Sequence, residues 1–546
     1  MLTRRKTRQG LNGQRERSPT TADDTDCEAM LKAMMNPIVL DRVFSSLSIP
    51  DLKSARLVCQ TWNTQGGARA VRKNTFLNLK KTWPCCNLFR PRPPPFHPNL
   101  AKRIKITDKC SCPQKAIKTS KQIGHQNKLD KAFFRNLPTF VALIHGSVEE
   151  MILFASHHFL AELPRMMYSH KFSNLKYLCI TPTHSSGNNV TVLDLQNKIL
   201  LPSLISFTVN IKCRFADSRL PIQQFVLDMA PNLETVILPI GERPSFKKCP
   251  KVKILHYDHK GDMDQMERAV EYVDIDEIVA MLEPIKNSLI NLKLWVGSGT
   301  KRDDQNVYNL PQLPNLTSLS LHCYQDKSPI HGFLRPEICP NLKHISLRMT
   351  DVGDTLPASI GTFWQNQMKN IESLDLKYLH RSGYWNISKI VEIFPSVKKF
   401  NLELKMRVLV FDSDEDISTH GGAQGVWKSR LREELKALQV WKLDPANVKI
   451  FVVRDVNHVK AVLEGMSAWS GKKTVAFNRN FSNYDSDPVE KTFTMTDAYS
   501  FSECFERVEF RGFDTCYDPR GDAMMKAFAE GRPRDKNLVV DRKESL

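Results

Sequence analysis

The sequence predicts an α/β chain in which a short helical unit precedes a long solenoid with a curved parallel sheet. Two hydrophobic patterns predict this fold class. Apolar residues recur at helical spacing between residues 37 and 62, and a frame of three apolar residues recurs nine times between residues 175 and 402. Hydrophobic periodicity is the main sequence signal of secondary structure.

The helical unit lies within residues 36–71. Asn36 is placed to cap a helix that has Pro37 at its first position, where a missing N–H costs nothing. We expect Asp51 to cap a second helix after the break at Pro50, and a third helix to begin near Trp62. Three helices in fewer than 40 residues make a small core, so part of their apolar surface should contact a partner.

These residues resemble the F-box over about 40 positions, except that the family usually opens with Leu-Pro, where this chain has Asn36-Pro37. The resemblance implies that the unit binds the small adaptor subunit of an SCF-type ubiquitin ligase and, through it, the cullin. It also implies which residues make the contact. They are Pro37, Ile38, Leu40, Val43, Leu47, Leu52, Leu57, Val58 and Trp62.

The second pattern is the frame apolar-x-x-apolar-x-apolar, usually preceded by Pro-Asn or a similar pair. Gaps between its copies are 29, 29, 19, 37, 27, 26, 29 and 26 residues, close to the roughly 20 to 29 of leucine-rich repeats. One repeat cannot bury its own apolar face, so the copies must stack. The first apolar residues of the copies are Leu175, Leu204, Leu233, Val252, Leu289, Leu316, Leu342, Ile371 and Val397. "SVEEMIL", from Ser147, fits one period earlier.

The copies resemble the cysteine-type leucine-rich repeats of F-box proteins. "CPNL" from Cys339 and "CPKV" from Cys249 are typical of that family. An Asn or Cys is expected three residues after the last leucine, but Tyr324, Thr350 and Leu379 stand there instead. The backbone hydrogen bonds that this side chain usually makes are therefore not expected.

The predicted organisation has seven parts, and two of them hold most of the charge. Residues 1–22 carry +5 and residues 80–131 carry +11, together 16 of the net +19. The parts are a disordered basic tail (1–30), the F-box (31–76), a basic linker (77–131), the leucine-rich-repeat solenoid (132–410), an acidic and glycine-containing loop (411–425), degenerate repeats or a small C-terminal domain (426–530) and a tail (531–546).

Composition bears on where the protein acts. Apolar runs fall far short of the roughly 20 residues of a membrane span, and the basic start is not followed by the apolar stretch of a secretory signal. Thirteen scattered cysteines, an odd number, are typical of reduced thiols. We expect a protein of the cytoplasm or nucleus that contacts no membrane.

No motif predicts catalysis, a cofactor or a metal. A zinc site is weighed at Cys85, Cys86, Cys110 and Cys112 with His97, but an adjacent pair is poor spacing for one tetrahedral ion. The sequence therefore predicts a non-catalytic adaptor. The alternative is a nucleic-acid-associated scaffold that uses residues 1–22 and 80–131 to bind phosphates. Those segments have few aromatics for base stacking, so nucleic acid is not the expected partner.

The target protein, whose identity the sequence does not predict, is expected on the concave face of the sheet. There, side chains alternate with the buried leucines along each strand. Between Leu289 and Leu404 this face gathers donors beside one aromatic ring, which suits an acidic or phosphorylated peptide; a solvated charged face is the alternative. The predicted contact residues are Lys293, Trp295, His322, His344, Arg348, Lys377 and Lys399.

Overall fold

The structure is a computed structural model, and its chain divides into two compact units. The first holds residues 1–78 and 93–105, and the second holds residues 79–92 and 106–546. The residues that the structure describes are 23–63, 76–80, 102–107, 141–155, 157–182, 201–210, 221–239, 243–257, 275–296, 310–324, 332–350, 368–380, 387–406, 432–443, 446–451, 456–478, 495–511, 530 and 537–541.

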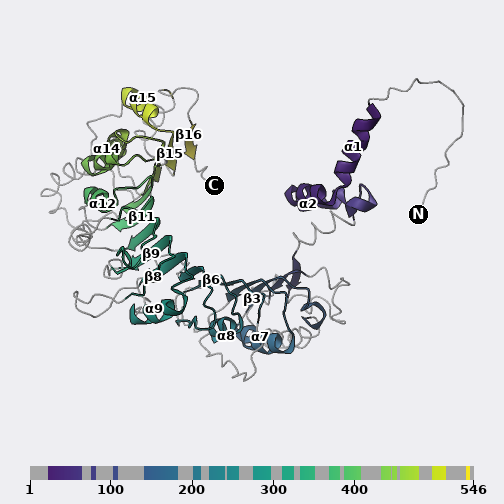
Figure 1. Cartoon of the computed structure of the whole chain (residues 1–546). Coiled ribbons are helices and arrows are strands. Elements are labelled where there is room, and N and C mark those ends of the chain that lie inside the picture. Colours follow the sequence, from purple (N-terminus) through teal and green to yellow (C-terminus); the bar gives the residue numbers. More distant parts are fainter. Residues whose placement is uncertain are drawn as a thin grey trace, which may run out of the picture. The chain divides into compact units, whose positions relative to one another are not determined.

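The first unit contains helices α1 (Asp23–Met35), α2 (Pro37–Ser46) and α3 (Ile49–Ala55) (Figure 1). A further helical turn begins at Gln60. The prediction of a disordered tail over residues 1–30 is wrong from residue 23 on, where helix α1 begins. Residues 28–34 are Glu, Ala, Met, Leu and Lys, all good helix formers, and Lys32 pairs with Glu28 one turn away.

The start of α2 is as predicted, but that of α3 is not. The Asn36 side chain accepts a hydrogen bond from the Ile38 N–H at 2.9 Å, with Pro37 in the first turn. The cap of α3 is Ser48 instead of Asp51. Its hydroxyl accepts from the Asp51 N–H at 3.4 Å and donates to the Asp51 carboxylate at 2.5 Å. Pro50 thus lies in the first turn of α3, where proline is tolerated, and not between the helices.

A small apolar core holds the first unit together. Leu40, Phe44, Leu52 and Ala55 are buried, and Leu47 and Trp62 pack against them. The Trp62 ring meets Phe44 edge-on, with centroids 5.4 Å apart. Its indole N–H also donates to the backbone oxygen of Met34 at 3.2 Å, which ties the end of α1 to this core.

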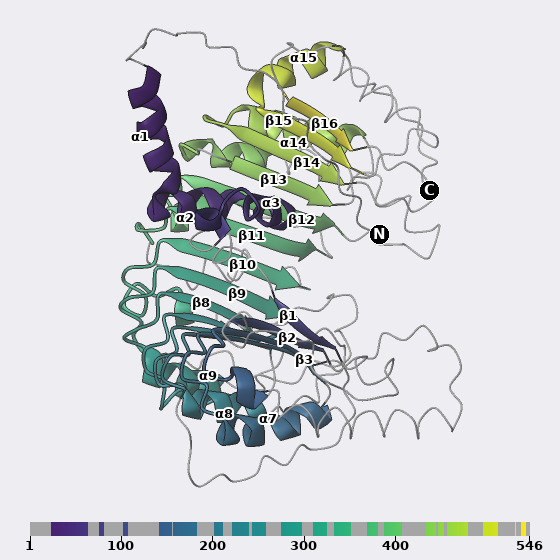
Figure 2. The same cartoon turned by 90° about the vertical axis from the view of Figure 1, so that its right-hand side faces the viewer.

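The second unit is built on a parallel sheet in which strands β3 to β16 pair in chain order (Figure 2). The strands line the inner side of a curve and the helices lie outside it (Figure 1). The strands are β3 (Glu150–Ala155), β4 (Tyr177–Pro182), β5 (Ser206–Val209), β6 (Thr235–Leu238), β7 (Ile254–Tyr257), β8 (Asn291–Val296), β9 (Ser318–Tyr324), β10 (His344–Thr350), β11 (Ser373–His380), β12 (Lys399–Met406), β13 (Ala446–Phe451), β14 (Lys473–Asn478), β15 (Arg507–Arg511) and β16 (Asn537–Asp541). The helices are α7 (His157–Ser169), α8 (Pro221–Met229), α9 (Ile275–Leu282), η5 (Glu283–Ile285), α12 (Ile387–Ile393), η6 (Leu438–Val440), α14 (Val456–Ser467) and α15 (Met495–Cys504).

This arrangement confirms the coarse fold that the sequence predicts, an α/β solenoid with a parallel sheet. Each of the nine repeat frames leads into a strand, and the first apolar residue of every frame is buried. Within the strands the expected alternation holds, as in β8, where Leu292 and Leu294 are buried and Lys293 faces the other side.

Two further predictions are wrong, those of the basic linker and of the C-terminal tail. Strands β1 (Leu77–Lys80) and β2 (Arg103–Thr107) lie in the expected linker. Ile104 and Ile106 are buried, so the basic residues of β2 occupy only its other face. β16 lies in the expected tail after residue 531. The sheet continues without a break from β12 through β16, so of the two alternatives for residues 426–530 the structure agrees with degenerate repeats and not with a separate small domain. The predicted loop 411–425 lies outside the described residues.

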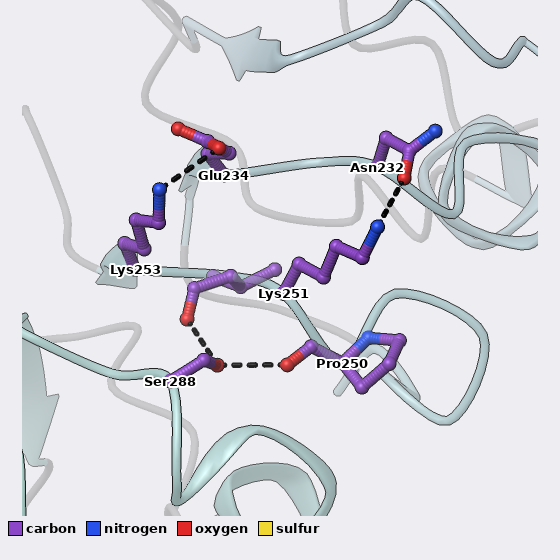
Figure 3. Close-up of polar contacts among 7 residues, drawn as sticks. Asn232, Glu234, Pro250, Lys251, Lys253 and Ser288 are labelled. Carbon is purple, nitrogen blue, oxygen red and sulfur yellow. Dashed lines mark hydrogen bonds and ion pairs between the residues drawn. The ribbon is translucent and has the colours of Figure 1, made fainter.

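Polar side chains join neighbouring repeats at the turns before several of the strands. The amide of Asn232 donates to the Pro202 oxygen at 2.9 Å, and that of Asn341 donates to the Pro314 oxygen at 2.8 Å. Ser288 does the same toward Pro250, and Lys253 pairs with Glu234 beside it (Figure 3). The Asn of the Pro-Asn pair before the strand thus makes side-chain to backbone bonds, whereas the sequence predicts none from the position after the strand.

Candidate functional site

The first unit exposes an unusual share of large apolar side chains. Of the fifteen exposed large hydrophobic residues in the described part of the chain, nine lie between residues 30 and 58. They are Met30, Leu31, Met34, Met35, Ile38, Val39, Val43, Leu57 and Val58. So many exposed apolar side chains in one small unit make it a candidate binding surface.

The residues predicted to contact an adaptor divide into two groups. Ile38 and Leu57 are 80% and 87% exposed, and Pro37, Val43 and Val58 are exposed with them. These five side chains are available to a partner.

The other four predicted residues serve the core of the unit. Leu40 is 2% exposed and Leu52 is fully buried, so neither offers surface to a partner. Leu47 and Trp62 are partly buried against the same core. A helical apolar pattern does not distinguish the side that packs inward from the side that binds, because both are apolar.

On the concave face, strand pairing brings four of the seven predicted target-binding residues together. Trp295, His322, Arg348 and Lys377 are register partners on β8, β9, β10 and β11. Neighbouring strands lie about 4.8 Å apart, so these residues form one continuous row.

The other three predicted residues lie on two parallel rows of the same face. Lys293 pairs with Ser320. His344 and Lys399 both occupy the first position of their strands, with Ser373 between them.

Two residues of the row, which the sequence predicts to be accessible to the target, are buried instead. Trp295 is 4% exposed and His322 is 5% exposed, and their rings meet edge-on with centroids 6.4 Å apart. They form a packed floor and not a contact surface. Arg348, His344 and Lys399 are exposed, and Lys293 and Lys377 are half-buried.

Acidic side chains accompany the basic ones. Lys377 forms an ion pair with Glu403 on β12 at 3.5 Å. The Ser346 hydroxyl donates to the Asp375 carboxylate at 3.1 Å. The concave face of β8–β12 is therefore less basic than a list of its cations suggests, because part of the charge is balanced within it.

The described residues contain no group of three or more potential metal ligands. The cysteines of the possible zinc site lie outside them, as do residues 1–22 and most of 80–131. Two cysteines sit in the solenoid core. Burial raises the pKa of the Cys339 thiol to about 12, and burial with the nearby Asp228 raises the pKa of Cys249 to about 12. Such thiols stay protonated and act as packing groups.

Comparison with known proteins adds no relative. No protein-family model matches the chain, and no curated protein matches it significantly. Among the described helices, none combines the length and the apolar character that crossing a membrane requires.

Proposed function

We propose that this chain is a substrate-binding adaptor of an SCF-type cullin-RING E3 ubiquitin ligase. Its helical unit, as an F-box, docks on the ligase's adaptor subunit, and its solenoid, as leucine-rich repeats, captures a target protein. The observation that carries the proposal is the cluster of exposed apolar side chains around Ile38 and Leu57 on a unit whose own core is small. That cluster coincides with the residues that resemble the F-box.

In this proposal each unit binds another protein, and neither catalyses a reaction. Exposed apolar area of this kind stabilises a complex when a partner buries it. The solenoid offers a long face of alternating polar side chains, held by stacked buried leucines. Ubiquitin transfer belongs to other subunits of the ligase, which the chain would bring to its target.

The test is co-purification of the full chain with the adaptor subunit and cullin. Ile38→Asp and Leu57→Asp each place a charge in the interface, which should cost several kcal/mol and reduce adaptor binding by about a hundredfold or more. Ile290→Asp is the matched control, because Ile290 is an exposed apolar residue of the solenoid. It should bind the adaptor like the unmodified chain.

Folding is checked by circular dichroism, since both test residues are exposed and their replacement should leave the core intact. Leu40→Asp is unsuitable, because Leu40 is buried and its loss would unfold the unit. An unmodified chain that captures no adaptor, or an Ile38→Asp chain that captures it undiminished, would falsify the proposal.

A further inference from the structure

Charge is distributed unevenly along the concave face. On β4–β7 the outward positions, such as Cys179, Thr208 and Ile237, carry no Lys, Arg, Asp or Glu. On β8–β12 the outward side chains that the structure describes include four cations and two carboxylates, a net charge of +2. These charged residues are Lys293, Arg348, Lys377, Lys399, Asp375 and Glu403. Strands β8–β12 are therefore the positive part of this stretch.

The cations of this face differ in whether an acidic side chain already pairs with them. Lys377 is engaged by Glu403, as described above. The side chains of Arg348 and Lys399 are exposed and form no hydrogen bond or ion pair with any residue that the structure describes. Their charges are available to a ligand.

The surroundings of Arg348 favour a defined anion contact. Its register partner on one side is His322, which is buried against Trp295 and gives a rigid floor. Its register partner on the other side is Lys377, which is paired with Glu403. A guanidinium grips a carboxylate or phosphate through two parallel hydrogen bonds, which a flexible ammonium does not.

The distance between Arg348 and Lys399 determines how far apart two anionic groups of a ligand would lie. Lys399 lies two strands from Arg348 and four positions earlier along its strand. With about 4.8 Å between strands and about 3.3 Å per residue, the two Cα atoms are roughly 16 Å apart. An extended chain covers that span in about five residues.

We propose that this face binds an acidic peptide segment of the target, with Arg348 and Lys399 contacting two anionic side chains about five residues apart. The inference rests on the proposed function, since the segment belongs to the captured protein. A peptide fits better than a nucleic acid. The net charge is small, and the aromatic rings of the row, Trp295 and His322, are buried and unable to stack on bases.

The experiment uses the full chain and three synthetic libraries of twelve-residue peptides. Two positions, five residues apart, are fixed as Glu, phosphoserine or Gln, and the rest are randomised. The Glu and phosphoserine libraries should be retained about tenfold better than the Gln library, and this excess should fall as salt rises from about 0.05 to about 0.3 M. Equal retention of the two anionic libraries indicates carboxylate recognition, whereas a further gain with phosphoserine indicates a phosphorylated target.

Variants locate the site. Arg348→Gln and Lys399→Gln should each remove most of the preference for anionic peptides, and Arg348→Glu should shift it toward a library with Lys at the fixed positions. Lys398→Gln is the matched control. Lys398 is the exposed neighbour of Lys399, and its ammonium lies 4.0 Å from Glu372 at the repeat turn. It should leave the preference unchanged.

The inference is overturned by equal retention of all three libraries on the unmodified chain, or by an Arg348→Gln chain that keeps the anionic preference. Displacement of the peptides by an equal concentration of single-stranded DNA would also overturn it in favour of nucleic acid. Adaptor co-purification is scored on the same preparations. Its failure with the preference intact refutes the ligase role alone, and its success without the preference refutes only the acidic segment.

Discussion

At the scale of single residues, two histidines make the solenoid sensitive to pH. The rings of His145 and His170 lie near each other, with centroids 5.6 Å apart, and His145 also contacts the backbone oxygen of Ala142. Burial, and then the neighbouring His145, lower the pKa of His170 below its ordinary value of 6.5. The folded chain therefore resists protonation of His170 more than the unfolded chain does.

The sign of the effect follows. Well above pH 6.5 His170 is neutral in both states, so its titration does not affect stability there. As pH falls below that value the unfolded state takes up the proton more readily, so stability is lost. We expect the urea midpoint to fall between about pH 7.5 and about pH 5.5, and His170→Asn to flatten that fall. His344→Asn, at an exposed position of β10, is the control; an equal flattening there would contradict the assignment.

At the scale of elements, the side chain of Lys473, the first residue of β14, caps the C-terminal end of helix α14. Lys473 is 4% exposed, and its ammonium donates to the backbone oxygens of Met466, Ser467 and Trp469 at 3.3, 3.2 and 2.5 Å. Met466 and Ser467 belong to the last turn of α14, whose carbonyls lack partners within the helix, and Trp469 follows two residues after its end. A cation at a helix C-terminus also interacts favourably with the helix dipole. Burial lowers the pKa of Lys473, so these hydrogen bonds offset a desolvation cost.

Replacing Lys473 with Met keeps the apolar stem and removes the ammonium donor from the backbone oxygens of Ser467 and Trp469, whereas the Met466 oxygen keeps its bond from the Trp469 N–H. We expect a loss of about 2 to 3 kcal/mol in the free energy of unfolding. Urea unfolding followed by tryptophan fluorescence measures it, because Trp441 and Trp469 are buried in the same region. Lys472→Met, at the exposed neighbouring position, should change stability by less than about 0.5 kcal/mol. Equal effects of the two changes would show that the carbonyl contacts do not matter.

Elements could be predicted where the repeat frame is regular. The strands β4–β12 follow frames with a Pro-Asn pair or a close variant, and all of them form. β14 was missed because its turn is made differently, with Gly471 in the left-handed region at φ 82°. β2 was missed because its charge hid the alternation of Ile104 and Ile106.

The sequence predicts on which element each candidate residue lies, but not whether its side chain is exposed. The sequence places Leu40 and Ile38 in one helix, yet only their packing separates a core residue from an exposed one. On the concave face, strand alternation correctly brings Trp295 next to His322. Their burial depends on how the two rings pack together, which no period in the sequence encodes.

At the scale of the whole molecule, the solenoid unit behaves as a stack in which each repeat depends on its neighbours. The contacts around Phe400 show that the C-terminal strands belong to this stack. Its ring lies 5.2 Å from that of Trp441 and 6.2 Å from that of Trp469. The buried Phe400 side chain of β12 thus contacts residues that precede β13 and β14. It does so although 40 residues lie between Met406, the last residue of β12, and Asn447 in β13.

This coupling predicts where a core mutation acts. Phe400→Ala should cost about 3 to 5 kcal/mol locally and open the neighbouring repeats. Amide hydrogen exchange should then rise in β12, β13 and β14, while β4 and β5 stay protected. Phe207→Ala in β5 is the matched control, since Phe207 is equally buried. It should raise exchange around β5 and leave β13 and β14 unchanged. If Phe400→Ala leaves residues 446–451 as protected as before, the C-terminal strands fold independently of β12, because a nearest-neighbour stack cannot lose one layer without loosening the next.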